Sequence, residues 1–211
     1  MNAKLTDITV VLDRSGSMAA CRAEAESGLN QFVKAQKEKA ADAAFTLVQF
    51  DHEYEVVHDA KPIRDVPHCS LVPSGTTALL DALGRTIIST GKRLEATPED
   101  KRPGLVVFVI LTDGHENASR EFKMAQIKEM VEHQREKYGW QFTYLGANQD
   151  AFTEAHGMGI PVAASANYVG QSTDKAFAAA ASNLSRMQCA VASCGPVVNT
   201  YSDQEREEIA K

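Results

Sequence analysis

The sequence has no long hydrophobic run: no apolar segment approaches the ~20 residues that a membrane-spanning helix needs. It also lacks the features of a signal peptide, since the first residues lead into a strand without a basic start, an apolar stretch and a cleavage site. These two absences exclude a membrane partner, and they lead us to expect a cytoplasmic protein.

Cysteine is scarce and is not spaced for a metal. The chain contains four cysteines, Cys21, Cys69, Cys189 and Cys194, without a C-x-x-C pair. Structural zinc sites commonly use such pairs, so we expect none here. In a reducing compartment the four side chains are expected to be free thiols. Cys189 and Cys194 are nevertheless close enough in sequence to form a small loop, and the sequence leaves open whether they pair.

Positively charged residues are fewer than negatively charged ones. The 211 residues carry 22 Lys and Arg against 28 Asp and Glu, a net charge of −6, without a basic cluster that would override this average. A nucleic-acid partner is therefore not expected. The length and the 44% hydrophobic content suit one globular domain with a substantial core. We expect a single domain over residues 1–190, followed by a C-terminal tail over 191–211 that is either frayed or packed on the domain.

Apolar strand-like segments alternate with amphipathic helical segments along the chain, a pattern typical of parallel sheets covered on both faces. The strands are expected at 5–12, 45–50, 54–58, 105–111, 140–145 and 161–164. The helices are expected at 18–40, 76–95, 120–137 and 174–189. A short connection before 54–58 predicts an antiparallel edge strand there. The fold class is thus α/β: a Rossmann-like, doubly wound, mostly parallel sheet with one antiparallel edge strand and helices on both faces.

Polar oxygen donors follow two of the predicted central strands. Asp13, Ser15 and Ser17 come directly after the apolar run 8–12, and Asp113 follows the run 105–111. In open parallel sheets, ligands bind at the carboxyl ends of the strands where the strand order reverses. Carboxylate and hydroxyl oxygens suit a hard cation such as Mg²⁺ or Mn²⁺. Ca²⁺ is less suitable because it prefers more ligands at longer distances.

These motifs, D-x-S-x-S at 13–17, a hydroxyl-bearing turn at 74–77 and T-D-G at 112–114, resemble the metal-ion-dependent adhesion site of the von Willebrand factor A (vWA) domain family. The resemblance implies that the metal ligands are Asp13, Ser15, Ser17, Thr77 and Asp113, with Asp113 reaching the metal through water. Thr76 departs from the family pattern, which often has a second glycine at that position. The chain resembles small stand-alone prokaryotic or phage-encoded members of this family.

The resemblance also implies a function, that of a metal-dependent protein-binding module. Two carboxylates just balance a dication, which leaves one coordination position open to an Asp or Glu of a partner protein. Arg14, Thr76, His115 and Glu116 would border this contact. Some relatives act with AAA+ ATPases or stress-response proteins, which here would have to be supplied in trans. The sequence does not name the partner or predict the oligomeric state.

An enzymatic alternative uses the same metal. A metal-assisted hydrolase would need a general base near the metal-bound water, and His115 or Glu116 is the nearest candidate. Asn117 and Ser119 are interpreted more simply as caps of the following helix. A weaker option is a structural particle component in which the metal site is idle. We found no catalytic motif such as a nucleophile elbow or a phosphate-binding loop, so we expect a protein that is not an enzyme.

Overall fold

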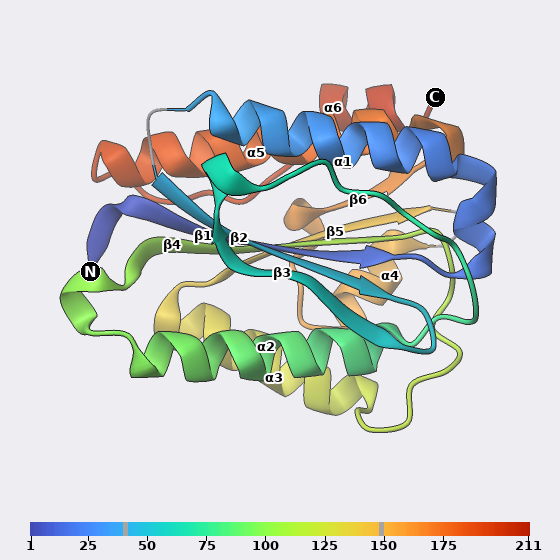
Figure 1. Cartoon of the computed structure of the whole chain (residues 1–211), viewed down its shortest axis with the longest axis horizontal. Coiled ribbons are helices and arrows are strands. Elements are labelled where there is room, and N and C mark those ends of the chain that lie inside the picture. The colour runs from blue at the N-terminus through green and yellow to red at the C-terminus, as the bar shows by residue number, and fades with distance from the viewer. Residues whose placement is uncertain (40–41, 148–149) are drawn as a thin grey trace.

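A six-stranded sheet forms the centre of the molecule, in a computed structural model that describes residues 1–39, 42–147 and 150–211 (Figure 1). The strands are β1 (Asn2–Asp13), β2 (Asp42–Phe50), β3 (Tyr54–Pro62), β4 (Pro103–Thr112), β5 (Gln141–Ala147) and β6 (Ser165–Tyr168). Their order is β3-β2-β1-β4-β5-β6, and all pairs are parallel except β2–β3. This confirms the predicted mostly parallel sheet with an antiparallel edge strand.

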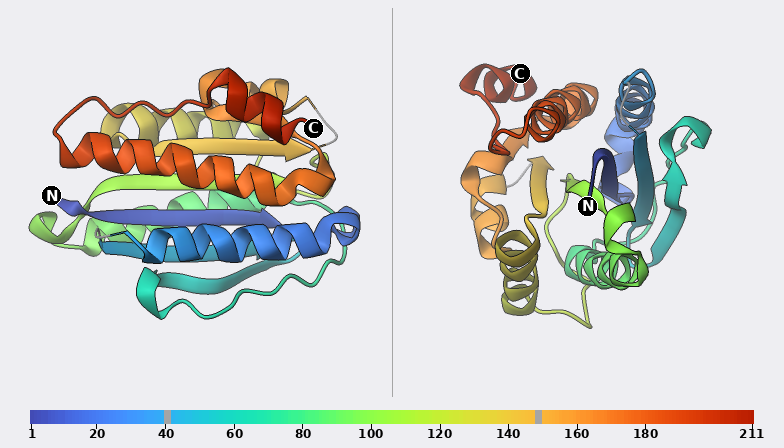
Figure 2. Two further views of the ribbon diagram at one scale, coloured as in Figure 1. Left: turned by 90° about the horizontal axis from the view of Figure 1, so that it is seen from above. Right: turned by 90° about the vertical axis from the view of Figure 1, so that its left-hand side faces the viewer.

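Helices cover both faces of the sheet, as the end-on view in Figure 2 shows. One face carries α1 (Arg22–Lys37), α5 (Thr173–Ala192) and α6 (Asp203–Ile209), and the other carries α2 (Leu79–Ala96), α3 (Met124–Tyr138) and α4 (Ala151–Gly157). Short 3₁₀ helices are η1 (Gly16–Cys21), η2 (Ile63–Asp65), η3 (Glu99–Lys101), η4 (Val162–Ala164) and η5 (Gly170–Ser172). No helix among the described residues is both long and apolar enough to span a membrane.

Strand β4 is apolar from Leu105 to Leu111 because each of its faces packs into a separate core. In β4, Val107 and Val109 belong to the core under α1 and α5, whereas Phe108 and Ile110 belong to the core under α2 and α3. Successive side chains of a strand point to opposite faces, so an uninterrupted apolar run is what a strand buried on both sides requires. The long buried strands β1 and β4 therefore hold their carboxyl ends in fixed positions.

Several predicted element boundaries were wrong. The last strand, expected at 161–164, is β6 at Ser165–Tyr168, because the Ala164 amide donates to Pro161 O at 2.9 Å and closes a 3₁₀ turn instead. The helix expected from position 18 begins with η1 and becomes α-helical at Arg22, and its expected end at Ala40 lies outside the described residues. The short helices α4 and α6 were not predicted.

The segment after α5 returns to the domain. Tyr201 and Ile209 are 2% and 1% exposed and belong to the core under α1 and α5. Asn199 donates to Phe142 O of β5 at 3.0 Å, which ties the segment to the sheet. All four cysteines are free thiols; Cys21 and Cys69 are buried, and Cys189 and Cys194 are exposed.

Candidate metal centre

Asp13 is the last residue of β1 and lies at the carboxyl end of the sheet, where β1 and β4 are neighbours. The chain leaves β1 toward β2 on one side, while β4 lies on the other, so this is the point where the strand order reverses. The Asp13 side chain is completely buried. Its carboxylate accepts hydrogen bonds from the Ser15 amide at 2.6 Å and from Thr112 Oγ1 at 2.5 Å.

The two serines of the first loop contact each other, and Ser17 also contacts the second carboxylate. Ser15 Oγ and Ser17 Oγ are 3.1 Å apart, and Ser17 Oγ donates to Asp113 Oδ1 at 2.7 Å. Asp113 follows β4 and is 6% exposed. Residues 96 positions apart in sequence are therefore in direct contact.

Thr77, from the loop before α2, completes this group of donors. Its side chain is 3% exposed, and its amide donates to Asn117 Oδ1 at 3.0 Å. A Cβ atom added to Gly114 would lie 3.1 Å from Thr77 Oγ1, 3.5 Å from Ser17 Oγ and 3.8 Å from Ser15 Oγ. Three hydroxyls from two loops thus surround a single point beside Gly114. The five residues predicted as ligands are brought together.

The two carboxylates are buried, and their burial shifts the pKa of each. Burial raises the pKa of Asp13 to about 6, although hydrogen bonds from Thr112 and Ser15 oppose the shift. Burial likewise raises the pKa of Asp113, and the bond from Ser17 opposes it. Among the described residues, neither carboxylate forms an ion pair with Lys or Arg. A bound dication would neutralise both charges and satisfy the hydroxyl oxygens.

The donor set suits a hard cation. In the described part of the chain, no group of three or more His, Cys, Asp or Glu side chains lies close enough to hold a metal ion. A metal at this site would therefore take most of its protein ligands from hydroxyls, together with the two carboxylates. Such all-oxygen ligation is typical of Mg²⁺ and Mn²⁺, and Mg²⁺ usually keeps several waters as well.

The residues predicted to border the site have different surroundings. Thr76 and His115 are exposed. Arg14 forms ion pairs with Asp51 at 3.3 Å, with Glu53 at 3.6 Å and with Glu55. The Arg14 guanidinium is thus held by carboxylates at and just before the start of the edge strand.

Glu116 is partly buried and faces the chain itself. Its carboxylate accepts hydrogen bonds from the amides of Leu80 at 3.0 Å, Ala118 at 3.0 Å and Ser119 at 2.7 Å, and from Ser119 Oγ at 2.8 Å. Asn117 and Ser119 accept from amides at the start of α2, so the prediction that they cap the following helix was wrong. Their partners lie about 40 residues back in sequence, where no local pattern indicates them.

Sequence reasoning missed two residues that support the site. Thr112 donates to the Asp13 carboxylate, and Gly114 leaves room for the three hydroxyls. Both belong to the T-D-G motif, in which only the aspartate was assigned a role. A threonine before the aspartate and a residue without a side chain after it were the available signals.

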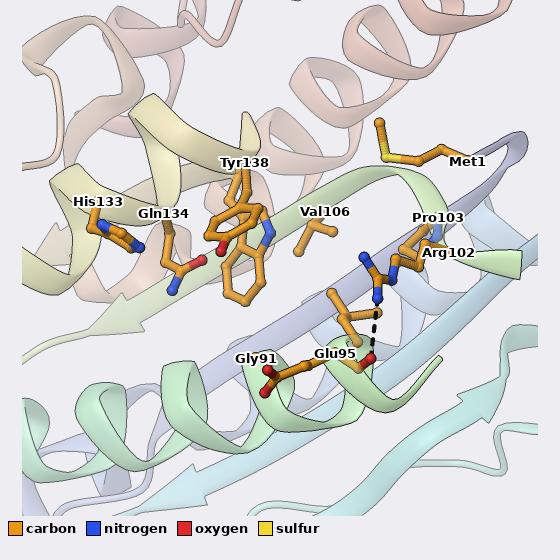
Figure 3. Close-up of a pocket in the computed structure, with 11 residues that line it drawn as sticks. Met1, Gly91, Glu95, Arg102, Pro103, Val106, His133, Gln134 and Tyr138 are labelled. Carbon is orange, nitrogen blue, oxygen red and sulfur yellow. Dashed lines mark hydrogen bonds between the residues drawn. The ribbon is translucent and has the colours of Figure 1, made fainter. Parts of the chain in front are cut away.

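A different hollow lies at the opposite end of the sheet (Figure 3). It has a volume of about 490 Å³ between α2 and α3, and its walls include Trp140, Tyr138, His133 and Arg102. The Arg102 guanidinium donates to the carbonyls of Thr97 at 2.8 Å and Glu95 at 3.0 Å. This hollow is at the amino end of β4, so topology and chemistry both favour the cluster at the other end.

No family model matches the chain, and no curated protein matches it. Solved structures do. They include proximal thread matrix protein 1 from the mussel byssus with a zinc-occupied metal-ion-dependent adhesion motif (16% identity, TM-score 0.60, 85% of this chain and 48% of that one). They also include a von Willebrand factor type A protein from Catenulispora acidiphila (14% identity, TM-score 0.57, 84% of this chain and 42% of that one). A third is the von Willebrand factor domain of the type V pilus tip protein Mfa5 from Porphyromonas gingivalis (13% identity, TM-score 0.60, 85% of this chain and 95% of that one).

The chain spans less than half the length of the mussel and Catenulispora chains but covers 95% of the Mfa5 domain. At these identities the likeness concerns the fold. The sheet order, the antiparallel edge strand and the helices on both faces agree with that likeness. The chain therefore has the fold of the von Willebrand factor A domains.

Proposed function

We propose that this chain is a metal-dependent protein-binding module. Asp13, Ser15, Ser17, Thr77 and Asp113 hold a divalent cation, Mg²⁺ or Mn²⁺, and a carboxylate of a partner protein completes its coordination. The observation that carries this proposal is the convergence of three hydroxyls on a point beside two buried carboxylates that have no basic partner among the described residues. The cation would supply an electrophilic centre for an anionic oxygen.

Charge balance supports a carboxylate as the partner's ligand. Three of the five proposed ligands are neutral hydroxyls, and Asp113 is expected to reach the metal through water, so the cation would stay electrophilic and its open position would favour an anionic oxygen over a neutral one. Thr76 and His115 are exposed beside the site and are available to a partner. Solved structures of the same fold include a pilus tip domain and a pilus adhesin, whose names point to adhesion rather than to catalysis.

The enzymatic alternative has less support. A general base needs a free lone pair directed at the metal-bound water. The Glu116 carboxylate already accepts four hydrogen bonds from the chain. His115 is the remaining candidate. Metal-dependent hydrolysis that disappears in His115→Ala would favour the enzyme.

Calorimetry on chelator-treated protein tests the metal site. We expect one Mg²⁺ or Mn²⁺ site per chain in the wild type, weaker Ca²⁺ binding, and no binding in Asp13→Ala. Zn²⁺ belongs in the series because the mussel protein holds zinc at its adhesion motif. Asp203→Ala is the matched control, since the Asp203 side chain is fully exposed. Equal binding by wild type and Asp13→Ala would place the metal elsewhere.

A random peptide library displayed on phage tests the partner chemistry. Peptides captured in Mg²⁺ and released by chelator should be enriched in Asp or Glu at one position. Peptides that bind equally well in chelator would contradict the metal bridge. The proposal extends to an AAA+ ATPase or a stress-response protein of the cytoplasm as the natural partner, which affinity purification in Mg²⁺, with chelator elution, would identify.

A further inference from the structure

The loop after Asp113 supplies caps to the start of α2. Three amides at that helix end donate to side chains of the loop. The pairs are Thr77 N to Asn117 Oδ1 at 3.0 Å, Leu80 N to Glu116 Oε2 at 3.0 Å, and Asp81 N to Ser119 Oγ at 3.1 Å. The first turn of a helix has no intrahelical acceptors for its amides, so these bonds fill a requirement that α2 itself leaves open.

Groups at the start of α2 in turn accept hydrogen bonds from amides of the loop. The Asp81 carboxylate accepts hydrogen bonds from three successive amides, those of Arg120 at 2.8 Å, Glu121 at 2.9 Å and Phe122 at 2.9 Å. The Thr77 carbonyl accepts from the amides of Asn117 at 3.0 Å and Ala118 at 3.1 Å. The two segments are therefore joined in both directions, and neither carboxylate is directed at solvent.

This reciprocal capping lies beside the candidate metal centre. Asp81 follows Thr77 by four positions, and Glu116 follows Asp113 by three. Thr77 and Asp113 belong to different loops, so the spacing of their oxygens depends on how the two loops are held together. Hydrogen bonds to ionised carboxylates are stronger than those between neutral groups. Removing an acceptor would leave amides unsatisfied and free the loops to separate.

We propose that Asp81 and Glu116 are positioning residues of the metal centre. They hold the Thr77 hydroxyl and the Asp113 carboxylate at the spacing that one small cation requires, before the cation arrives. This role rests on the proposed function. It assigns a role to the buried Asp81 and the partly buried Glu116, which are not among the proposed metal ligands, and it predicts that metal affinity depends on both.

The test measures Mn²⁺ affinity in Glu116→Gln and Asp81→Asn. The dissociation constant should rise about 10- to 100-fold, the range found when groups that orient metal ligands are removed. The Mn²⁺ electron paramagnetic resonance spectrum should also change, because the ligand symmetry changes. Glu205→Gln is the matched control: Glu205 caps α6 by accepting from Ser202 N at 2.8 Å, and α6 lies on the opposite face of the sheet from α2 (Figure 1). Its affinity should equal that of the wild type.

A metal-free measurement separates positioning from folding. In chelator, amide hydrogen exchange at Leu80, Arg120 and Glu121 should accelerate in both variants, while the amides of β1 and β4 keep their protection. Ser119→Ala, which removes one hydroxyl, is the milder variant if either carboxamide variant fails to fold. Glu116→Gln keeps one carbonyl acceptor, so it should retain more affinity than Glu116→Ala.

Two results would overturn the proposal in different ways. If the variants with accelerated amide exchange bind Mn²⁺ with wild-type affinity, the capping serves the fold alone. The metal site proposed above would then stand. A wild type that binds no Mn²⁺, or binds it equally in Asp13→Ala, would remove the proposed function and the positioning role with it.

Discussion

Gly114 shows how a single residue can permit a site without contributing a ligand. An added Cβ would lie 3.1 Å from Thr77 Oγ1, a crowded contact that requires this hydroxyl to move by a few tenths of an ångström. We expect Gly114→Ala to fold normally and to weaken Mg²⁺ binding by about tenfold or more, as disturbed metal-site geometry commonly does. Calorimetry measures this effect. Gly91→Ala is the control, because a Cβ there meets nothing within 4 Å. Equal losses of Mg²⁺ affinity in the two variants would argue against crowding at Gly114 as the cause.

The burial of Asp13 predicts that the stability of the metal-free protein depends on pH. The sign is opposite to that of an aspartate whose pKa is lowered on folding. The carboxyl titrates near 3.8 when unfolded and near 6 when folded, so between these pH values the folded chain binds more protons than the unfolded chain. The stability of the metal-free protein should therefore fall as the pH rises through this interval. The loss is on the order of 2–3 kcal/mol.

Denaturation in chelator at pH 4, 5, 6 and 7 measures this loss. Asp13→Asn, which cannot titrate, supplies the reference: the stability of the wild type minus that of Asp13→Asn should fall as the pH rises and should reach its limiting value above pH 6. Mg²⁺ binding must release the Asp13 proton, so affinity should fall below pH 6. A constant difference across the range would show that the carboxyl is not shifted.

At the scale of elements, the sequence predicted strands better than helix starts. A strand such as β4 is recognisable because a continuous apolar run is required by burial on both faces. The sequence predicts a helix from Arg120, whereas α3 begins at Met124. The amides of residues 120–122 donate instead to Asp81, about 40 positions earlier. The five residues of the candidate metal centre could be predicted because their motifs stand at strand ends and in the loop before α2, and ligands bind at that edge of a parallel sheet. The bond from Leu80 N to Glu116 could not be predicted, because no local pattern indicates a partner 36 positions away.

The edge strand β3 yields a prediction about association. No strand pairs with its outer side among the described residues, and Val56 on it is 46% exposed. Glu53 and Glu55 place charge at its start and also hold Arg14. Charged side chains discourage edge-to-edge pairing, so the double variant Glu53→Gln/Glu55→Gln should self-associate more than the wild type in light scattering. Glu207→Gln/Glu208→Gln changes the net charge equally at exposed positions of α6; if it associates as much, net charge alone is responsible.

For the whole molecule, the segment after α5 decides whether the domain is one cooperative unit. The Asn199 side chain joins this segment to β5 and α5: its Nδ2 donates to Phe142 O at 3.0 Å, and its Oδ1 accepts from Asn183 Nδ2 at 2.7 Å and from Thr143 Oγ1 at 3.2 Å. Asn183 and Thr143 are 0% and 1% exposed. Asn199→Ala would leave buried polar groups unsatisfied, which costs about 1–3 kcal/mol.

Denaturation followed by the fluorescence of Trp140, the single tryptophan, measures this cost. Trp140 packs in the core under α2 and α3, whereas Tyr201 and Ile209 pack in the core on the other face of the sheet. If the chain unfolds in one step, Asn199→Ala should lower the midpoint reported by Trp140, with Mg²⁺ affinity at low denaturant unchanged. Gln204→Ala, at an exposed position of α6, should leave the midpoint unchanged. A Trp140 transition that does not respond to Asn199→Ala, together with early loss of α6 helicity, would show instead that the C-terminal segment detaches on its own and that the sheet and its metal centre are stable without it.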